Sequence, residues 1–199
     1  MKYIYNIDKL KNHNENTVFE EKIGKKAQNL LELAAAGFNV PHFSVITNRY
    51  FKEIILKEIE MYNQEAGNND EIKDWNAVFS GNTERKIENI IRIIKNHKIK
   101  EEFEKEIENA LNEESYYAVR SSSIEEDSSN FSFAGQFETY LYVKKENMLE
   151  KIKEVWISSF SNHVMKYRKE GKINNEINVP AVIIQEMINS EKAGVGFSV

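Results

Sequence analysis

Arg120 stands at the end of an apolar segment, directly before a loop that is rich in serine. The stretch 116–143 begins as an apolar strand, passes through this polar loop, which contains Gly135, and returns as a second strand. A guanidinium group is a persistent planar donor, and a flexible serine and glycine loop offers backbone N–H groups to an anion. The pattern therefore favours a phosphate site. One alternative stays open, in which Arg120 forms a structural ion pair with an acidic residue of segment 125–127.

A second candidate anion site lies at Gly24, Lys25 and Lys26, directly before a segment with helical periodicity. A helix N-terminus carries unpaired N–H groups and partial positive charge, which an anion can use. Spacing alone, however, favours the plainer interpretation, an exposed amphipathic helix with solvated lysines. The helix is expected to end at Gly37. Its apolar positions are Ala27, Leu30, Leu31, Ala34 and Ala35.

Composition narrows the class of protein. The chain has 199 residues and a formal net charge of −5, so that a general nucleic-acid binder, which needs a basic excess, is disfavoured. It contains no cysteine, which excludes disulfides, thiolate metal sites and cysteine nucleophiles. The N-terminal sequence lacks the apolar core of a signal peptide, and no later run has the roughly 20 apolar residues of a membrane span. We therefore expect a cytoplasmic protein without a membrane partner.

The chain offers no evident metal ligands. Its four histidines, at positions 13, 42, 97 and 163, are too scattered for a metal-binding motif, and we expect each to be a surface or packing residue. Glu126 and Asp127 are adjacent acids in the polar loop. They fit a solvated acidic turn as well as a catalytic role, and their spacing does not make them a metal pair.

The expected elements alternate between strands and helices, which suggests an α+β fold with a mixed sheet. Apolar periodicity predicts a helical insertion over about 52–113, in which four isoleucines of segment 83–97 form a stripe that packs on a core. A longer helix is expected from Glu146 to Phe160, continuing toward Arg168, with Trp156 in the core. The expected strands are 3–7, 43–47, the two strands of 116–143, 179–187 and the beginning of another in the last residues, where the chain is expected to be truncated.

Four segments, in order along the chain, resemble the N-terminal ATP-binding domain of phosphoenolpyruvate synthase and pyruvate phosphate dikinase, an ATP-grasp fold. The similar segments are IGKKAQNLLEL with GFNVP, AVRSS followed by ED and SFAGQFET, VWISSF with YR, and IQEM leading to FS. The sequence departs from the family at two positions, where Lys25 replaces the second glycine and Gln28 replaces a small alanine. At Lys25 a side chain occupies space that glycine leaves open.

The resemblance implies a role for each matching residue. Lys26 and Arg120 would contact the ATP phosphates, and Arg120 is the implied catalytic residue. Gly135 would let the loop 133–139 close over the phosphates, and Thr139 would reach the phosphates or the ribose. Gln185, Glu186 and Met187 would lie along the adenine, offering backbone edges and an apolar surface.

The same resemblance implies that the whole chain, 1–199, is part of an ATP-grasp domain from an enzyme that transfers phosphoryl groups from ATP to a histidine on another domain, and then to pyruvate. Mg²⁺ would assist, with its ligands outside this chain, and the partners would be the phosphohistidine and pyruvate-binding domains of the full enzyme. The fragment alone is expected to bind ATP weakly and to be inactive.

Three alternatives remain: the ATP-binding domain of a rifamycin-type antibiotic phosphotransferase, a non-catalytic nucleotide-sensing domain, and a purely structural module. The changes at Lys25 and Gln28 are the hints in favour of a sensing domain. The third alternative would leave Lys26, Arg120 and the glycine loop without a common explanation.

Overall fold

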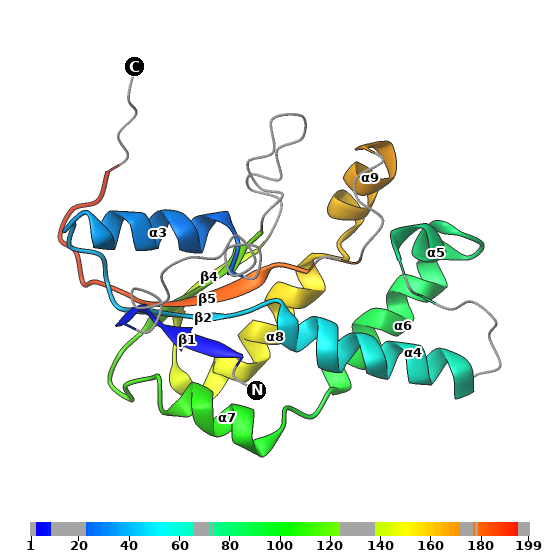
Figure 1. The fold of residues 1–199 in the computed structure, drawn as a ribbon, viewed down its shortest axis with the longest axis horizontal. Coiled ribbons are helices and arrows are strands. Elements are labelled where there is room, and N and C mark those ends of the chain that lie inside the picture. Colours follow the sequence, from blue (N-terminus) through cyan, green and yellow to red (C-terminus); the bar gives the residue numbers. More distant parts are fainter. Residues whose placement is uncertain are drawn as a thin grey trace.

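A computed structural model describes residues 3–8, 23–65, 72, 74–123, 138–171, 177 and 179–194. Within these residues the strands form one five-stranded sheet in the order β1-β2-β5-β3-β4 (Figure 1). The strands are β1 (Ile4–Asn6), β2 (Phe43–Ile46), β3 (Tyr117–Ser122), β4 (Thr139–Val143) and β5 (Ala181–Glu186). The segment 195–199, where a further strand was predicted, lies outside the described residues.

The α+β class is confirmed, but the mixed sheet is not, because all four described strand pairs are antiparallel. The mixed sheet was predicted from the alternation of strands and helices, because parallel strands are usually joined through a helix. Residues 7–24 separate β1 from the helix that follows it, and a connection of that length lets the chain enter the next strand in either direction. The pairing of β1 with β2 is antiparallel, with Ile4 opposite Ile46 and Asn6 opposite Ser44.

The described elements between β2 and β3, where the helical insertion was predicted, are all helices. One of them, η1, is a π-helix, and η3 is a short 3₁₀-helix. Side chains of Asp74 and Asn82 cap two helices by accepting from the N–H groups of Ala77 at 2.8 Å and Arg85 at 3.1 Å. The helices are α3 (Lys25–Ala35), η1 (Phe51–Ile55), α4 (Leu56–Glu65), α5 (Trp75–Phe79), α6 (Thr83–Asn96), α7 (Glu101–Glu108), η3 (Lys145–Asn147), α8 (Met148–Ser158) and α9 (Asn162–Gly171).

The long helix predicted from Glu146 toward Arg168 is divided into α8 and α9. The last turn of α8 tightens into bonds between residues three apart, from the N–H groups of Ser159, Phe160 and Ser161. The Ser161 side chain then accepts from Val164 N–H at 3.4 Å, while its carbonyl accepts from Met165 N–H at 2.9 Å. Serine side chains compete for backbone partners in this way, which is why the break occurs at the SSFS sequence.

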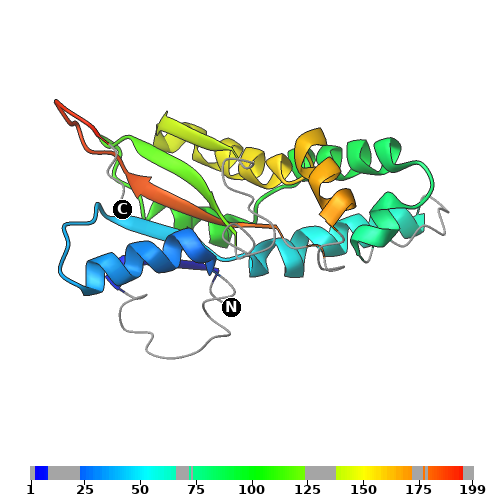
Figure 2. The ribbon, with the colours of Figure 1, turned by 90° about the horizontal axis from the view of Figure 1, so that it is seen from above.

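The sheet separates two apolar layers of unequal size (Figure 1). On one face α3 packs, through Ala27 and its half-buried leucines, on residues such as Phe43, Val45 and Ile183. The opposite face carries the larger layer, which includes α8 and the helices between β2 and β3. Figure 2 shows the cyan and green helices α4, α5 and α6 gathered at one end of the molecule, past the strands.

The larger layer is built around aromatic side chains. Tyr50 stacks on Phe103 and on Trp156, with ring centroids 4.1 and 5.6 Å apart. Trp156 is completely buried, which confirms its predicted place in the core. The isoleucine stripe of α6 is also confirmed, since Ile90 and Ile94 are fully buried and Ile87 and Ile91 pack against the same cluster. Each such side chain stabilises the fold by about 1.5 to 3 kcal/mol.

Candidate nucleotide-binding site

Strands β3, β4 and β5 present three of the predicted site residues on the sheet face that carries α3. Arg120 lies opposite Thr139 on one neighbour and Ile183 on the other, while Ala118 lies opposite Gln185. Because alternate residues of a strand share a face, Arg120, Thr139 and Gln185 lie on the same side of the sheet as Ile183, which packs under α3. Residues from three strands, separate in the sequence, therefore meet in one region.

A direct hydrogen bond joins two of these residues. The Nη1 group of Arg120 donates to Oε1 of Gln185 at 3.1 Å. Gln185 is buried and Arg120 is half-buried, so that the amide holds the guanidinium at the edge of the interior. A neutral amide leaves the charge of Arg120 uncompensated by this contact. The carboxylate partner considered for Arg120 would come from segment 125–127, which lies outside the described residues.

The first turn of α3 is fastened to the end of β3. The N–H of Lys25 donates to the carbonyl of Ser123 at 3.1 Å, and the N–H of Ala27 donates to Oγ of Ser122 at 3.1 Å. Two of the helix N-terminal N–H groups are thus already used inside the protein. An anion near this helix would depend mainly on side chains, above all that of Lys26, which lies in the same turn and is partly exposed.

Positions 24 and 25, which match the two glycines of the family motif, differ in whether the backbone requires glycine. Gly24 has a φ of 76°, and a Cβ atom added to it would lie 2.2 Å from the carbonyl oxygen of Ser122. Lys25 is the first residue of α3, and Tyr142 is the one described non-glycine residue with positive φ. The backbone at position 25 therefore makes no demand for glycine, and a lysine there is compatible with the fold.

Glu186 and Met187 continue from β5 and use their N–H groups within the protein. The N–H of Glu186 donates to the carbonyl of His42 at 2.9 Å, and the N–H of Met187 donates to the carbonyl of Tyr116 at 2.8 Å. The Glu186 carboxylate accepts from the hydroxyl of Ser115 at 2.6 Å. Because these N–H groups are bonded within the protein, the backbone carbonyl groups of Glu186 and Met187 are the candidate contacts for an adenine base.

Exposed apolar side chains gather beside Met187. The rings of Tyr116 and Tyr142 meet edge to face at 6.2 Å, and the N–H of Tyr142 donates to Sδ of Met187 at 3.1 Å. Tyr142 is 69% exposed and Ile188 is 61% exposed. Tyr142 has a φ of 56°, which is uncommon for a bulky residue. Nothing in the sequence around Tyr142 predicted this conformation.

Some predicted residues lie outside the described part of the chain, namely Gly135, Glu126 and Asp127. Of the four histidines, His13 also lies outside it, while His42 and His163 are exposed.

His97 is a buried packing residue, as predicted, with Nδ1 2.8 Å from Glu58 Oε2 and Nε2 3.0 Å from the Tyr50 hydroxyl. Burial raises the pKa of Tyr50 to about 12, which keeps the hydroxyl available as a donor. Since a carboxylate only accepts, Nδ1 donates to Glu58, and Nε2 shares a hydrogen bond with the Tyr50 hydroxyl.

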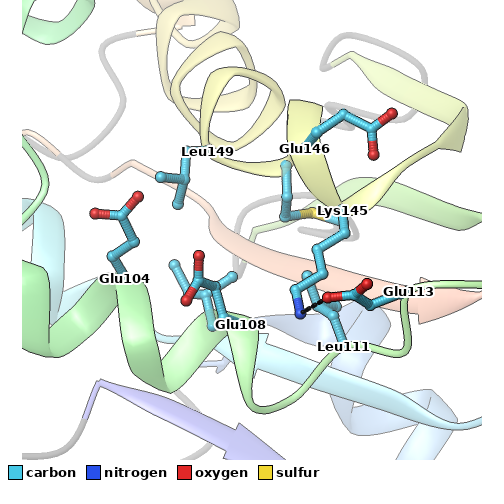
Figure 3. A pocket seen from close by; sticks show the side chains of 9 residues that line it. Glu104, Glu108, Leu111, Glu113, Lys145, Glu146 and Leu149 are labelled. Atoms are coloured by element: carbon cyan, nitrogen blue, oxygen red, sulfur yellow. Dashed lines mark hydrogen bonds and ion pairs between the residues drawn. The ribbon is translucent and has the colours of Figure 1, made fainter.

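Two cavities lie away from the candidate site. One, of about 360 Å³, lies between α7 and the start of α8 and is lined by Glu104, Glu108, Glu113 and Glu146, with Lys145 as the cation among its lining residues (Figure 3). Lys145 is already paired with Glu113 at 3.2 Å. The other, of about 680 Å³, is lined by residues of α4, of α6 and of the turn after α6, including Arg92 and His97. The acidic lining of the first cavity would repel the negative charge of a nucleoside triphosphate.

The family of pyruvate phosphate dikinase AMP/ATP-binding domains matches residues 20–199. The chain belongs to this family. An ATP-grasp-like fold follows from that membership. In this AMP/ATP-binding domain, α3 is fastened to β3 on the face of the sheet where Arg120, Thr139 and Gln185 lie.

Among the described residues, no group of three or more His, Asp or Glu side chains could hold a metal ion, and no helix has the length and apolar character needed to cross a bilayer.

Individual relatives of this AMP/ATP-binding domain are phosphotransferases and synthases by name. A probable phosphoenolpyruvate synthase of Archaeoglobus fulgidus is 35% identical over 88% of this chain and 24% of the relative. An uncharacterized phosphotransferase of Bacillus subtilis, YvkC, is 51% identical over 41% of this chain and 10% of the relative. Rifampicin phosphotransferase of Bacillus cereus is 43% identical over 43% of this chain and 10% of the relative. The chain therefore spans between about a tenth and a quarter of the length of these relatives.

Sequence reasoning selected Lys26, Arg120, Thr139 and Gln185 from the motif and missed the contact that connects two of their elements. Ser122 belongs to the same motif, directly after Arg120 and Ser121, but nothing in its spacing indicates that it bonds to a helix 95 residues away along the chain. The proximity of Gly24 to Ser122 is equally invisible in the sequence. The sequence placed Gly24 in a candidate anion site, without a prediction of its conformation.

Proposed function

We propose that this chain is the ATP-binding portion of a phosphotransferase of the phosphoenolpyruvate synthase or pyruvate phosphate dikinase type. The observation that carries the proposal is the meeting of Arg120, Thr139 and Gln185 on the face that α3 covers, with Lys26 in the fastened first turn of that helix. A fixed arginine and a lysine near one strand end suit the charge of a triphosphate, and the net charge of −5 requires that such cations act locally.

Each residue has a proposed task. Arg120, oriented by Gln185, and Lys26 bind the phosphates and neutralise charge as it develops on the transferred group. Thr139 is exposed at the beginning of β4 and donates to a phosphate or to the ribose. Gly135 lets the preceding loop approach the phosphates. The carbonyl groups of Glu186 and Met187, with the apolar side chain of Met187, face the adenine.

In the proposed reaction the terminal phosphates of ATP pass to a histidine of another domain, and one phosphoryl group then passes to pyruvate. Mg²⁺ would supply charge neutralisation at the phosphate oxygens, as in phosphoryl transfer generally. The described residues do not fit a site for it, since no suitable acidic or histidine cluster is found among them. We therefore propose that its ligands lie outside this chain, as do the histidine and pyruvate domains, and that the enzyme is cytoplasmic and the fragment alone inactive.

The alternatives have less support. The rifampicin phosphotransferase match covers 43% of the chain, whereas the archaeal synthase match covers 88%. The hint of a non-catalytic sensing domain from Lys25 is weakened because the backbone there is helical and does not require glycine. Phosphoryl transfer toward pyruvate remains the preferred proposal.

The test is a titration of the 199-residue protein with Mg-ATP, followed by NMR. We expect chemical-shift changes around Lys26, Arg120 and Gln185, and we expect Arg120→Ala to weaken ATP binding by at least about tenfold, because a charge-assisted contact is lost. Arg92→Ala is the matched control, because Arg92 is an exposed arginine on α6. If saturating Mg-ATP leaves all three segments unchanged, the chain has no ATP site of the proposed kind.

A further inference from the structure

The N-terminus of α3 is capped by a residue of a different element. Gly24 occupies the N-cap position of α3 and has no side chain with which to accept a hydrogen bond. In ordinary caps a serine or aspartate at that position accepts from the third helical N–H. Here Ser122 of β3 caps the helix, since its Oγ accepts a hydrogen bond from the N–H of Ala27, the third residue of α3, at 3.1 Å in a buried contact.

The cap requires that the helix and the strand touch closely. A Cβ atom at position 24 would lie 2.2 Å from the Ser122 carbonyl oxygen and 2.7 Å from its Oγ. The neighbouring bond from Lys25 N–H to the Ser123 carbonyl, at 3.1 Å, holds the same two elements a second time. No residue larger than glycine can stand at position 24 while this contact lasts.

The contact joins the two elements that carry the cations of the proposed phosphate site. Ser122 is two residues beyond Arg120 on the same face of β3, and Ala27 directly follows Lys26. A change in the way that α3 sits on β3 therefore moves Lys26 relative to Arg120. Errors of about 1 Å in the placement of such groups can cost up to about 100-fold in activity.

We infer that Ser122 is a positioning residue, which caps α3 from β3 and thereby fixes Lys26 relative to Arg120. The inference rests on the proposed function for its consequence in ATP binding, but the cap itself does not depend on that function. Ser122 does not touch the phosphates in this account. It acts through the first turn of α3.

Ser121 supplies a matched control. It is the adjacent serine of the same strand and is also completely buried, but its hydroxyl has no hydrogen-bond partner among the described residues. It lies on the opposite face of the sheet, because alternate residues of a strand face opposite ways. Ser121→Ala and Ser122→Ala therefore remove the same atom at the same depth, and only the second removes the cap.

The experiment compares these two variants in the 199-residue protein by amide hydrogen exchange and by titration with ATP and with adenosine. We expect Ser122→Ala to speed exchange at Ala27 by about tenfold or more, because the amide loses its partner, and to shift the resonances of Lys26. It should weaken ATP binding by about fivefold to tenfold and leave adenosine binding unchanged, because adenosine carries no phosphates. Ser121→Ala should match the wild type in all three measurements.

The outcomes separate the inference from the proposed function. If Ala27 exchanges at the wild-type rate in Ser122→Ala, the cap does not exist and the inference fails. If exchange accelerates but ATP and adenosine weaken equally, Ser122 supports the fold in general and does not position Lys26, which also overturns the inference. If the wild-type protein binds no ATP, the proposed function fails, and a Ser122→Ala variant that moves the Lys26 resonances still supports the cap, whereas unchanged resonances overturn it.

Discussion

Gly24 lies at a point where both conformation and space exclude a side chain. Its φ of 76° and ψ of 167° give a backbone conformation that is essentially restricted to glycine and costs other residues about 1 to 3 kcal/mol. The Ser122 carbonyl would meet an added Cβ at 2.2 Å, and backbone cannot withdraw as a flexible side chain can. Gly81, with a φ of 62°, has nothing within 4 Å of the same position, so that only the conformational cost applies there.

The pair of glycines gives a prediction about stability. We expect Gly24→Ala to lower the free energy of unfolding by more than about 2 kcal/mol, and Gly81→Ala to lower it by about 1 kcal/mol, because only the first substitution adds a collision to the conformational cost. Urea unfolding followed by circular dichroism measures both values. Equal losses in the two variants would show that the close contact between α3 and β3 contributes nothing.

The sequence motif was sufficient to predict which residues belong to the site. The identities and order of Arg120, Thr139 and Gln185 pointed to a nucleotide, and the structure brings these three to one face. The bond between Arg120 and Gln185 was not predictable, because it depends on the register of β3 against β5. Local sequence does not specify the register between strands that are distant in the chain.

At the scale of elements, η1 forms a hydrogen bond with Tyr3, the residue directly before β1. Glu53 of η1 accepts from the Tyr3 hydroxyl at 3.1 Å and from Arg49 Nε at 2.9 Å. Partial burial tends to raise the pKa of Glu53, but the hydrogen bonds from Arg49 and Tyr3 outweigh it, so that the pKa lies below its ordinary value of 4.5. The folded protein therefore releases this proton more readily than the unfolded chain does.

This difference predicts how stability depends on pH. The contribution of Glu53 is present above pH 4.5, its ordinary value, and is lost as the pH falls toward the lower pKa of the folded protein. Because the group is partly exposed, we expect the loss to be no more than about 1 kcal/mol. Urea unfolding between pH 7 and pH 3 should show a shallower fall in stability for Glu53→Gln than for the wild type. Glu32→Gln, on the exposed side of α3, should retain the wild-type slope, and parallel curves for all three proteins would contradict the prediction.

Most elements followed from periodicity, and the exceptions have physical causes. The stripe of α6 was predicted because its apolar residues repeat at the helix period. Strand β5 was predicted from a continuous run of apolar, β-branched residues, and all of its residues except the last are buried. The break between α8 and α9 was missed, because the apolar face continues through Phe160 while the flanking serines end the helix. The antiparallel direction of β1 against β2 was not predicted, because a hydrophobic pattern does not encode the direction in which two strands pair.

At the scale of the whole molecule, the sheet keeps the proposed binding residues apart from the main core. Tyr50, Trp156 and their neighbours fill the larger layer, whereas the face with Arg120 is packed only by α3 among the described helices. A substitution at Arg120 should therefore change binding more than stability. Since ligands stabilise the state to which they bind, a thermal shift can separate these two effects.

We predict that 10 mM Mg-ATP raises the midpoint of thermal unfolding of the 199-residue protein by about 3 to 6 °C, if the dissociation constant is about 1 mM, because ligand linkage then adds about 1.4 kcal/mol. Differential scanning fluorimetry measures the shift, with 10 mM adenosine expected to give a smaller one. Arg120→Ala should unfold near the wild-type midpoint without ligand and should lose most of the ATP shift, while Arg92→Ala should retain it. An ATP shift that persists in Arg120→Ala would mean that the nucleotide binds elsewhere, because the guanidinium of Arg120 on β3 would then make no contribution to holding the phosphates.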